Sequence, residues 1–437
     1  MRICHFTNTF LPHVGGVARA VQTLLEDQRR ARHRVLVVAP EFAEGVAPRR
    51  IERSVERIPA ITHFNHSDFS VRLPVAAALS DRLANFRADI LHAHHPFLLG
   101  DTALREGASR QVPVIFTHHT LYERYTHYLP WDSDTVQGIA AELATRFANR
   151  CNAVIAPSES VRKLIVDRGV NVPVHVVPTG IDLARLAAGQ GERARQRWKI
   201  AADAPVIGHL GRFAEEKNLA FLTRALATVL QQRPHAWALL VGDGPERERM
   251  EAILQAAGVR TRVVFTGKLS GPRLHDACAA MDLFAFASTT ETQGLVLAEA
   301  MAAGAPVVAL DASGARDVVR DEVNGRLLPA SETEDGLAAA LLAGLDQPDL
   351  RRAWQQGART TAAEFDRQRT SARLLDVYGD TMERYRAASS TLTPLEEVWD
   401  PFIERIATEA RLLADKAGSV IRALTEPAAV LREPAQV

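Results

Sequence analysis

Short apolar runs alternate along the chain with longer segments of helical periodicity. The runs are apolar on both faces, which is typical of parallel strands that helices cover on each side. In the first part of the chain they are ICHFT, RVLVVAP, DILHAH, VPVIFTH, NAVIAP and VHVVP. Helical periodicity lies between them, near 17–30, 75–86, 135–149 and 158–168. This alternation predicts a doubly wound α/β domain.

A second series of the same kind follows a polar segment over 182–203, which we interpret as a surface connection. Its strands are PVIGHLG, WALLVGDG, RVVFTGK, LFAFAS and APVVAL, with helices near 218–232, 246–257, 273–280, 295–303 and 314–320. The fold class is therefore α/β, with two tandem Rossmann-like domains that face each other across a cleft. Clefts at domain interfaces commonly hold ligands.

We expect an N-terminal domain over 1–183, a second domain over 200–370, and a helix over 371–390 that crosses back to the first domain. The tail over 391–437 carries an apolar stripe of helical spacing, with both charge signs and an acidic excess on its other face. A purely electrostatic anchor to anionic lipid would be basic. We therefore expect the tail to pack against its own chain or a second copy, with membrane contact as the weaker alternative.

Composition narrows the function classes. The chain has 437 residues, of which 47% are hydrophobic and 24% charged, which is typical of a soluble globular protein. Lys and Arg together number 52, as do Asp and Glu, so no global field for nucleic acid exists. The 3 cysteines do not form a disulfide framework and fit a reducing compartment. We expect a cytoplasmic protein, with peripheral contact at the inner face of the membrane left open.

The most informative local segment is STTETQGLVLAEA, which follows the run LFAFA and precedes a helix. Free N–H groups at the helix start beside Gly294 and Leu295 favour an anion such as phosphate. Glu291 in the loop and Glu299 one turn into the helix are suited to sugar hydroxyls, because carboxylates accept strong hydrogen bonds. The alternative is an acidic segment that only complements the helix dipole.

Two further loops follow predicted strands. In GRFAEEKN, Arg212 and Lys217 are placed to hold a diphosphate, although a solvated loop with glutamate partners is the alternative. In PHVGGV, Gly15 and Gly16 allow backbone N–H groups to approach a ligand, and a plain tight turn is the alternative. The second loop lacks the GxGxxG fingerprint of nicotinamide cofactors.

Histidines are concentrated where strands of the first domain end, notably His94, His118 and His119. The carboxyl ends of such strands point into a ligand crevice, which favours a polar active-site lining. Ordinary buried histidines are one alternative. A metal site is the other, since His92 and His94 share a strand face, but no further ligand motif completes it.

These features occur together and in a fixed order, and in that combination the chain resembles the retaining glycosyltransferases of family 4, the glycosyl transferases group 1 of GT-B fold. The resemblance covers roughly residues 1–386. The stretch THHTLYERYTHYLP and the segment TETQGLVLAEA further resemble members that glucosylate diacylglycerol. The resemblance implies transfer of a hexose from a nucleotide sugar, with UDP-glucose as the expected donor, to a hydroxyl acceptor such as a lipid.

The resemblance also implies a role for each matching residue. Gly16 offers its N–H to the donor diphosphate, and His119 lies beside the donor sugar, with adjacent His118 and Tyr122 as further lining. Arg212 and Lys217 neutralise the leaving diphosphate. The remaining matches bind the donor: the Glu291 side chain holds sugar hydroxyls with backbone groups of Gly294 and Leu295 nearby, and Glu299 holds the ribose.

The implied chemistry needs no metal or other cofactor, because the two cations and the helix start stabilise the leaving group. Asn8, in TNTF, stands where many members have an aspartate, which we expect to alter acceptor contacts. A nucleotide-sugar epimerase of the same fold and a non-catalytic nucleotide-sugar-binding protein are the alternative functions. Nucleic acid is not an expected partner.

Overall fold

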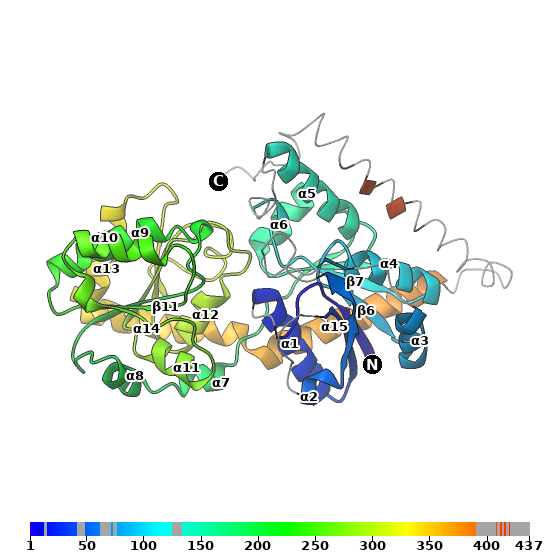
Figure 1. Cartoon of the computed structure of the whole chain (residues 1–437), viewed down its shortest axis with the longest axis horizontal. Helices are drawn as coiled ribbons and strands as arrows, with labels where there is room; N and C mark the ends of the chain where they lie inside the picture. Colours follow the sequence, from blue (N-terminus) through cyan, green and yellow to red (C-terminus); the bar gives the residue numbers. More distant parts are fainter. Residues whose placement is uncertain are drawn as a thin grey trace. The chain divides into compact units, whose positions relative to one another are not determined.

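The computed structural model describes residues 1–12, 15–41, 49–61, 71–72, 77–124 and 133–389, and in the tail residues 408, 411–412, 415–416 and 419. The chain forms two compact units. The first contains the described residues of Met1–Pro178 and Thr370–Val437, and the second contains Thr179–Arg369. Figure 1 shows both units in the colours of the sequence.

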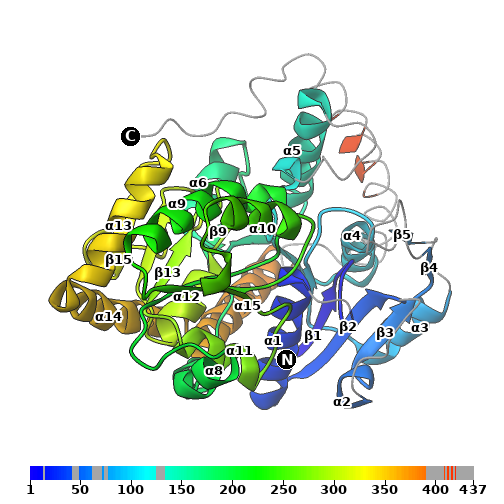
Figure 2. The ribbon, with the colours of Figure 1, turned by 60° about the vertical axis from the view of Figure 1, so that its left-hand side comes forward.

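The first unit is built on a parallel sheet of seven described strands. In spatial order they are β3 (Val55–Ile58), β2 (Arg34–Pro40), β1 (Arg2–Phe6), β6 (Ile90–Ala93), β7 (Val114–Thr117), β8 (Ala153–Ala156) and β9 (Val174–Val176). Figure 2 shows β1, β2 and β3 side by side. A short antiparallel pair joins β4 (Ala60–Ile61) and β5 (Val71–Arg72). The strand order reverses between β1 and β6, where doubly wound sheets bind ligands.

Helices cover both faces of this sheet because alternate strand residues point to opposite sides. Cys4 and Phe6 pack in the cluster that includes residues of α3 (Ala77–Phe86), α4 (Leu99–Arg110), α5 (Asp134–Ala148) and α6 (Glu159–Asp167). Ile3 packs on the other face against α15 (Arg367–Ser389). The β2 residues of that face meet α1 (Gly16–Arg30) and α2 (Arg49–Glu52).

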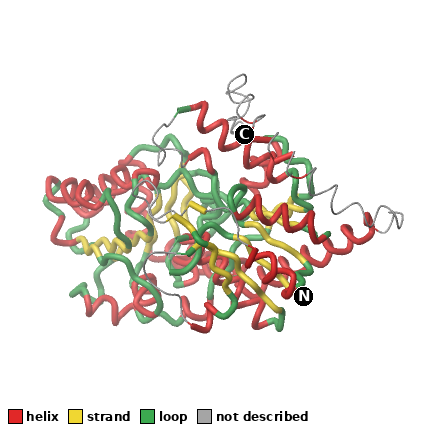
Figure 3. The backbone as a smooth tube through the Cα atoms, turned by 45° about the vertical axis from the view of Figure 1, so that its right-hand side comes forward, coloured by secondary structure: helices red, strands yellow, loops and turns green. Residues whose placement is uncertain are grey.

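The second unit repeats the architecture with a parallel sheet of six strands among Thr179–Arg369. In spatial order they are β12 (Val263–Phe265), β11 (Trp237–Val241), β10 (Val206–Leu210), β13 (Leu283–Phe286), β14 (Val307–Leu310) and β15 (Gly325–Leu328). The order reverses between β10 and β13. In Figure 3 the strands of each unit form a layer with helices on either side.

The helices of the second unit also divide between two faces. The first face packs against α9 (Leu219–Gln232), α10 (Arg247–Ala256) and α13 (Glu334–Asp346). The opposite face packs against α7 (Leu183–Ala187), α8 (Gly191–Arg197), α11 (Pro272–Ala279), α12 (Leu295–Ala302) and α14 (Pro348–Ala362). Three 3-10 turns complete this part of the chain: η3 (Glu215–Lys217), η4 (Arg260–Arg262) and η5 (Ala363–Phe365). The expected pair of Rossmann-like α/β domains is thereby confirmed.

Two local expectations differ from the structure. The segment 182–203, interpreted as a surface connection, contains α7 and α8, and buried Leu186 and Ala194 anchor these helices in the second unit. The helix expected near 314–320 is wrong, because the segment forms turns. Gly314 has a φ of +79°, which is outside the helical region, and its N–H donates to Asp317 Oδ2 at 3.2 Å. Such a local bond competes with helix formation.

Described residues of the tail pack against the first unit. Leu412 is 5% exposed and joins the core cluster of α3–α6. Asp415 accepts hydrogen bonds from Arg150 at 2.9 and 3.1 Å, and Lys416 Nζ lies 2.7 Å from Asp101 Oδ2. Within the described part of the chain, no helix is long and apolar enough to span a membrane.

Candidate active site

In the second unit, the loops that follow β10 and β13 bring the predicted charged residues together. These two strands are neighbours at the reversal of strand order, so the loops at their carboxyl ends meet. Arg212 follows β10, and its guanidinium pairs with Glu216 in the same loop. Lys217 is the last residue of the short 3-10 turn η3, which belongs to the same loop. Arg212 is half exposed, whereas Glu216 is nearly buried.

Lys217 and Glu291 are in direct contact, although they are far apart in the sequence. Lys217 Nζ donates to Glu291 Oε1 at 2.5 Å, and both side chains are largely buried, at 16% and 19% exposure. Charge-assisted bonds of this kind are among the strongest in proteins. Side-chain hydrogen bonds also join the same two loops, since the hydroxyls of Ser288 and Thr290 donate to the Glu216 carbonyl at 3.4 and 3.3 Å.

Two glycines allow the loop that carries Glu291 to approach the segment after β14. Gly294 caps α12 with a φ of +68°, and a Cβ there would lie 2.9 Å from the Gly314 carbonyl oxygen. A Cβ on Gly314 would lie 2.8 Å from the Glu291 Cβ. Leu295 begins α12 shortly after Glu291 in the sequence, and Glu299 lies in the second turn of that helix. The helix start offers unsatisfied N–H groups at this point.

His209 is a residue of this region that sequence reasoning missed. It lies on β10, is 1% exposed, and its ring centroid lies 6.0 Å from that of Phe284 and 6.1 Å from that of Phe286, both on β13. Its Nδ1 lies 3.1 Å from the Ala285 carbonyl oxygen. Burial lowers its pKa to about 4, so the ring is neutral near pH 7. A lone histidine inside an apolar run gives no sequence signal of a position next to the site.

The first unit holds the remaining predicted residues. Gly15 caps α1 and Gly16 begins it, so the first free N–H groups of α1 lie in the predicted glycine turn. A Cβ on Gly16 would meet nothing within 4 Å, so close packing does not explain the glycine there. His13 and Val14 of the PHVGGV loop lie outside the described residues, as do residues 125–130 of the THHTLYERYTHYLP stretch.

His5, His92, His94 and His119 form a connected cluster at the reversal of strand order in the first unit. Strand register brings these side chains together, because His5 of β1 is directly opposite His92 of β6. The His92 and His94 rings lie 4.2 Å apart between centroids, on the shared face that their spacing predicted. His94 Nδ1 lies 2.8 Å from His119 Nε2, which places His119 in the same cluster.

His118 and His119 differ in their surroundings, although they are adjacent. His118 is 3% exposed and packs edge-on against Phe116 and Tyr122, which makes it part of the core. His119 is half-buried and belongs to the histidine cluster. Burial lowers the pKa of His118 to about 4 and that of His119 to about 3. It raises the pKa of the Tyr122 hydroxyl above its usual value.

Among the described residues, His5, His92 and His94 have the spacing of a candidate metal cluster, since one ligand atom of each lies within 4.8 Å of the others. Hydrogen bonds account for all six ring nitrogens without an ion. His5 contacts His94 and Gln28, and His94 also contacts His119. His92 lies 2.6 Å from both the Tyr378 hydroxyl and Thr117 Oγ1. The cluster is therefore a satisfied polar network.

Asn8 also has a structural task. Its Nδ2 donates to the Phe97 carbonyl and its Oδ1 accepts from the Leu99 N–H, each at 3.1 Å. Its own N–H donates to His95 Nδ1 at 3.1 Å. Asn8 therefore ties the end of β1 to the start of α4.

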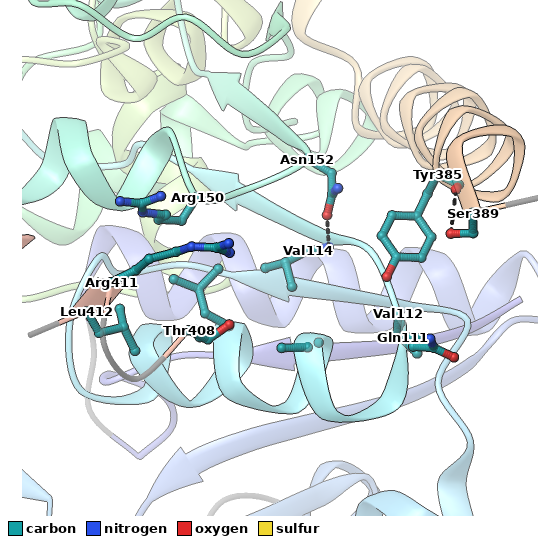
Figure 4. Close-up of a pocket in the computed structure, with 13 residues that line it drawn as sticks. Gln111, Val112, Val114, Arg150, Asn152, Tyr385, Ser389, Thr408, Arg411 and Leu412 are labelled. Carbon is teal, nitrogen blue, oxygen red and sulfur yellow. Dashed lines mark hydrogen bonds between the residues drawn. The ribbon is translucent and has the colours of Figure 1, made fainter. Parts of the chain in front are cut away.

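A cavity of about 290 Å³ lies elsewhere in the first unit, beside the residues that precede β7 and β8. Figure 4 shows Tyr385 and Ser389 of α15 on one side of it and Arg411 on the other. Asn152 accepts from the Val114 N–H at 2.8 Å at its edge. This cavity is at the amino-terminal ends of the strands, whereas His94 and His119 follow the carboxyl ends of β6 and β7.

Two family models match the chain. The model described as "Glycosyltransferase Family 4" matches residues 14–185, and "Glycosyl transferases group 1" matches residues 190–361. The chain is 30% identical over 363 residues to an alpha-monoglucosyldiacylglycerol synthase of Streptococcus pneumoniae, covering 80% of each protein. It is 31% identical over 349 residues to a GDP-mannose-dependent alpha-mannosyltransferase of Mycobacterium tuberculosis, covering 78% of this chain and 87% of that protein.

Solved structures show the same fold. Anabaena Alr3699/HepE in complex with UDP has a TM-score of 0.70 at 24% identity, covering 87% of this chain and 100% of that chain. Sucrose-phosphate synthase from Thermosynechococcus elongatus has a TM-score of 0.69 at 22% identity, covering 87% of this chain and 99% of that chain. With this sequence kinship and fold, the chain belongs to the family 4 glycosyltransferases of group 1, as a hexosyltransferase that uses a nucleotide sugar.

Proposed function

We propose that this glycosyltransferase moves glucose from UDP-glucose to a hydroxyl of diacylglycerol or a related lipid, with retention of configuration. The observation that carries the donor half is the contact between Lys217 and Glu291 beside the start of α12. It combines a cation for a diphosphate with a carboxylate for sugar hydroxyls. The similarity to monoglucosyldiacylglycerol synthases of Streptococcus pneumoniae and Acholeplasma laidlawii supports the glucose and lipid assignments.

In the proposed reaction, negative charge develops on the leaving nucleotide diphosphate. Arg212, Lys217 and the N–H groups at the start of α12 stabilise that charge, and oriented donors of this kind supply a large part of catalysis. Because Arg212 pairs with Glu216 and Lys217 with Glu291, the diphosphate must share or displace these carboxylates. The pairs hold both cations in place before the donor binds.

Glu291 is proposed as a positioning residue for sugar hydroxyls, because its carboxylate is held by Lys217. The acceptor then attacks on the face that the diphosphate leaves, and a leaving phosphate oxygen takes the acceptor proton. A retained product anomer, measured by NMR, is the expected result. An inverted anomer contradicts this scheme.

The remaining donor contacts are proposed from the resemblance of the sequence to the family. Gly16 is proposed to bind the diphosphate through its N–H, His119 to lie beside the sugar, and Glu299 to hold the ribose. No metal is required, because Arg212 and Lys217 supply the positive charge. Activity should therefore survive dialysis against EDTA, and a loss restored by one divalent metal would contradict this part of the proposal.

The test of function is nucleotide release from UDP-, GDP- and ADP-sugars, with and without diacylglycerol in detergent micelles. We expect release from UDP-glucose that rises with the lipid. Release from GDP-mannose instead would move the assignment toward the mannosyltransferases, which the Mycobacterium tuberculosis relative represents. Donor turnover that ignores the lipid would discard this acceptor, and a changed sugar without transfer would indicate an epimerase.

A lipid acceptor also predicts contact with the membrane surface. Sedimentation of the full chain with vesicles that contain diacylglycerol tests this directly. We expect part of the protein to sediment with the vesicles. Recovery of all the protein in the supernatant, together with lipid-independent turnover, would remove the lipid from the proposal. Binding of donor without any turnover would favour a non-catalytic binding protein.

A further inference from the structure

Gln28 stands at the start of a buried hydrogen-bonded chain that ends on His119. Gln28 lies on α1 and is fully buried, and its Oε1 is 2.8 Å from His5 Nε2. His5 Nδ1 is 2.9 Å from His94 Nε2, and His94 Nδ1 is 2.8 Å from His119 Nε2. The chain therefore runs from a helix through β1 and the end of β6 to the loop after β7.

All three histidines in this chain are neutral near pH 7. Burial lowers the pKa of His5 to about 4, that of His119 to about 3, and that of His94 well below its usual value. A neutral imidazole has one N–H donor and one acceptor nitrogen. In a chain of such rings, the direction of one hydrogen bond therefore dictates the direction of the next.

Gln28 supplies that direction. Its amide oxygen only accepts, so His5 carries its proton on Nε2 and accepts on Nδ1 from His94 Nε2–H. His94 then accepts on Nδ1 from His119 Nε2–H. In this orientation the Gln28 amide nitrogen lies 3.4 Å from the Tyr378 hydroxyl and donates to it. A reversed amide would reverse every bond in the chain.

The second contact of Gln28 leads to a parallel chain with a consistent direction. When the Tyr378 hydroxyl accepts from Gln28, it can donate to His92 Nδ1, which lies 2.6 Å away. His92 then donates from Nε2 to Thr117 Oγ1, also at 2.6 Å. The Gln28 amide thus orients two hydrogen-bonded chains. One ends at Thr117 of β7, and the other ends at His119 in the loop that follows β7.

We propose that Gln28 is a positioning residue that fixes His119 as the tautomer protonated on Nε2, acting through His5 and His94. His119 Nδ1 then accepts hydrogen bonds. This inference rests on the proposed function for its use, because His119 is there placed beside the donor sugar. In that position it accepts from a sugar hydroxyl and does not donate to a phosphate oxygen.

The first experiment reads the tautomer itself in the full chain labelled with 15N-histidine. Long-range 1H–15N NMR distinguishes a protonated ring nitrogen from a bare one, and the signals that disappear in His119→Gln assign the ring. We expect a protonated Nε2 and a bare Nδ1 at pH 7.5. A proton on Nδ1 overturns the proposal. Since no sugar is needed, this result is independent of whether the proposed transfer reaction is found.

The second experiment removes the amide. Gln28→Leu leaves His5 without an oriented partner, and we expect a mixture of His119 tautomers. The kcat/KM for the sugar donor should fall about twofold to tenfold, the range that one lost hydrogen bond gives. Gln22→Leu is the matched control, because Gln22 lies on the same helix and contacts Glu26 outside the chain. It should show the wild-type tautomer and rate.

A single unchanged tautomer in a folded Gln28→Leu protein would overturn the proposal. Gln28→Asn is the second variant, in case the leucine prevents folding. It keeps an amide but withdraws it by one methylene from His5, and the same mixture of tautomers is expected. A fall in kcat/KM with an unchanged tautomer would show a merely structural role for Gln28 and would also overturn the proposal.

Discussion

The proposed role of Lys217 in the reaction can be separated from its contribution to the stability of the fold. Lys217 is largely buried, and its ammonium group donates to the Glu291 carboxylate. Its removal takes this partner from the Glu291 carboxylate, which keeps 19% of its side chain exposed to water that can solvate it. The donor diphosphate, which Lys217 is proposed to bind, also loses a fixed positive charge. The consequences for catalysis and for stability should therefore separate.

We predict that Lys217→Ala lowers kcat/KM by about two to three orders of magnitude, as loss of an oriented charge-stabilising donor does. The free energy of unfolding should change by no more than about 1–2 kcal/mol. Lys268→Ala, at an exposed lysine of the same unit, is the control and should keep full activity. Steady-state kinetics and thermal unfolding of both variants decide it. Parallel loss of activity and stability in Lys217→Ala would indicate a structural lysine.

The buried histidines predict how stability depends on pH. Burial lowers the pKa of His5, His118 and His209 from 6.5 to about 4. Between these values the unfolded chain binds protons that the folded chain excludes, so stability falls as pH falls from 6.5 toward 4. Each histidine contributes a slope of about 1.4 kcal/mol per pH unit. Urea unfolding at several pH values measures this slope, and equal stability at pH 7 and pH 5 would contradict it.

At the scale of elements, the site depends on how closely the loop before α12 approaches the turn after β14. Gly314 permits that approach, because a Cβ there would press on the Cβ of Glu291. The left-handed backbone at Gly314 is a separate requirement. Gly258 shares the left-handed backbone, at φ +73°, but a Cβ there would meet nothing within 4 Å. A comparison of alanine variants at Gly314 and Gly258 therefore distinguishes the effect of backbone strain from the effect of steric contact.

We predict that Gly258→Ala destabilises the protein by about 1–2 kcal/mol, since it forces alanine into the left-handed region. Gly314→Ala should destabilise it more, because the new Cβ also presses on Glu291. Only Gly314→Ala should also lower activity, at least about tenfold, because it displaces Glu291. Thermal unfolding and donor turnover measured side by side test this difference. Full activity in a folded Gly314→Ala protein would show that the contact does not govern the site.

At the scale of the whole molecule, the chain returns to its first unit near the end. The helix α15 contributes buried Tyr378 to the histidine network, and the tail contributes Asp415 beside Arg150 and Arg146. The first unit is therefore assembled from segments more than three hundred residues apart, since the Gln28–Tyr378 contact alone spans 350 positions. Its polar network is complete only after the second unit has been synthesised.

We predict that Asp415→Asn lowers the free energy of unfolding by about 1–2 kcal/mol, because two arginines lose a mostly buried carboxylate. Asp346→Asn is the matched control. Asp346 pairs with Arg233 at a more exposed position, and its loss should cost less than about 1 kcal/mol. Urea unfolding of both variants measures the contrast. Equal effects would show that the tail contributes no more than an ordinary surface ion pair.

The sequence by itself determined the two Rossmann-like sheets, the loops that carry Arg212, Lys217 and Glu291, and the helix that carries Glu299. Its signals are local: apolar runs mark buried strands, and polar segments directly after them mark the carboxyl edge of a parallel sheet. A prediction was wrong where the local signal was ambiguous. The segment 314–320 has a helical pattern but forms turns, because a side-chain bond and a left-handed glycine hold it otherwise.

Only the tertiary structure decided which polar residues act together. It placed Lys217 against Glu291, buried His118 in the core, and joined His119 to Gln28 through two other histidines. It also found His209 beside the site. These relations depend on strand register and on the return of α15, which bring distant positions into contact. No local pattern records such contacts, because the residues involved are ordinary in their own segments and meet only when the sheet is assembled.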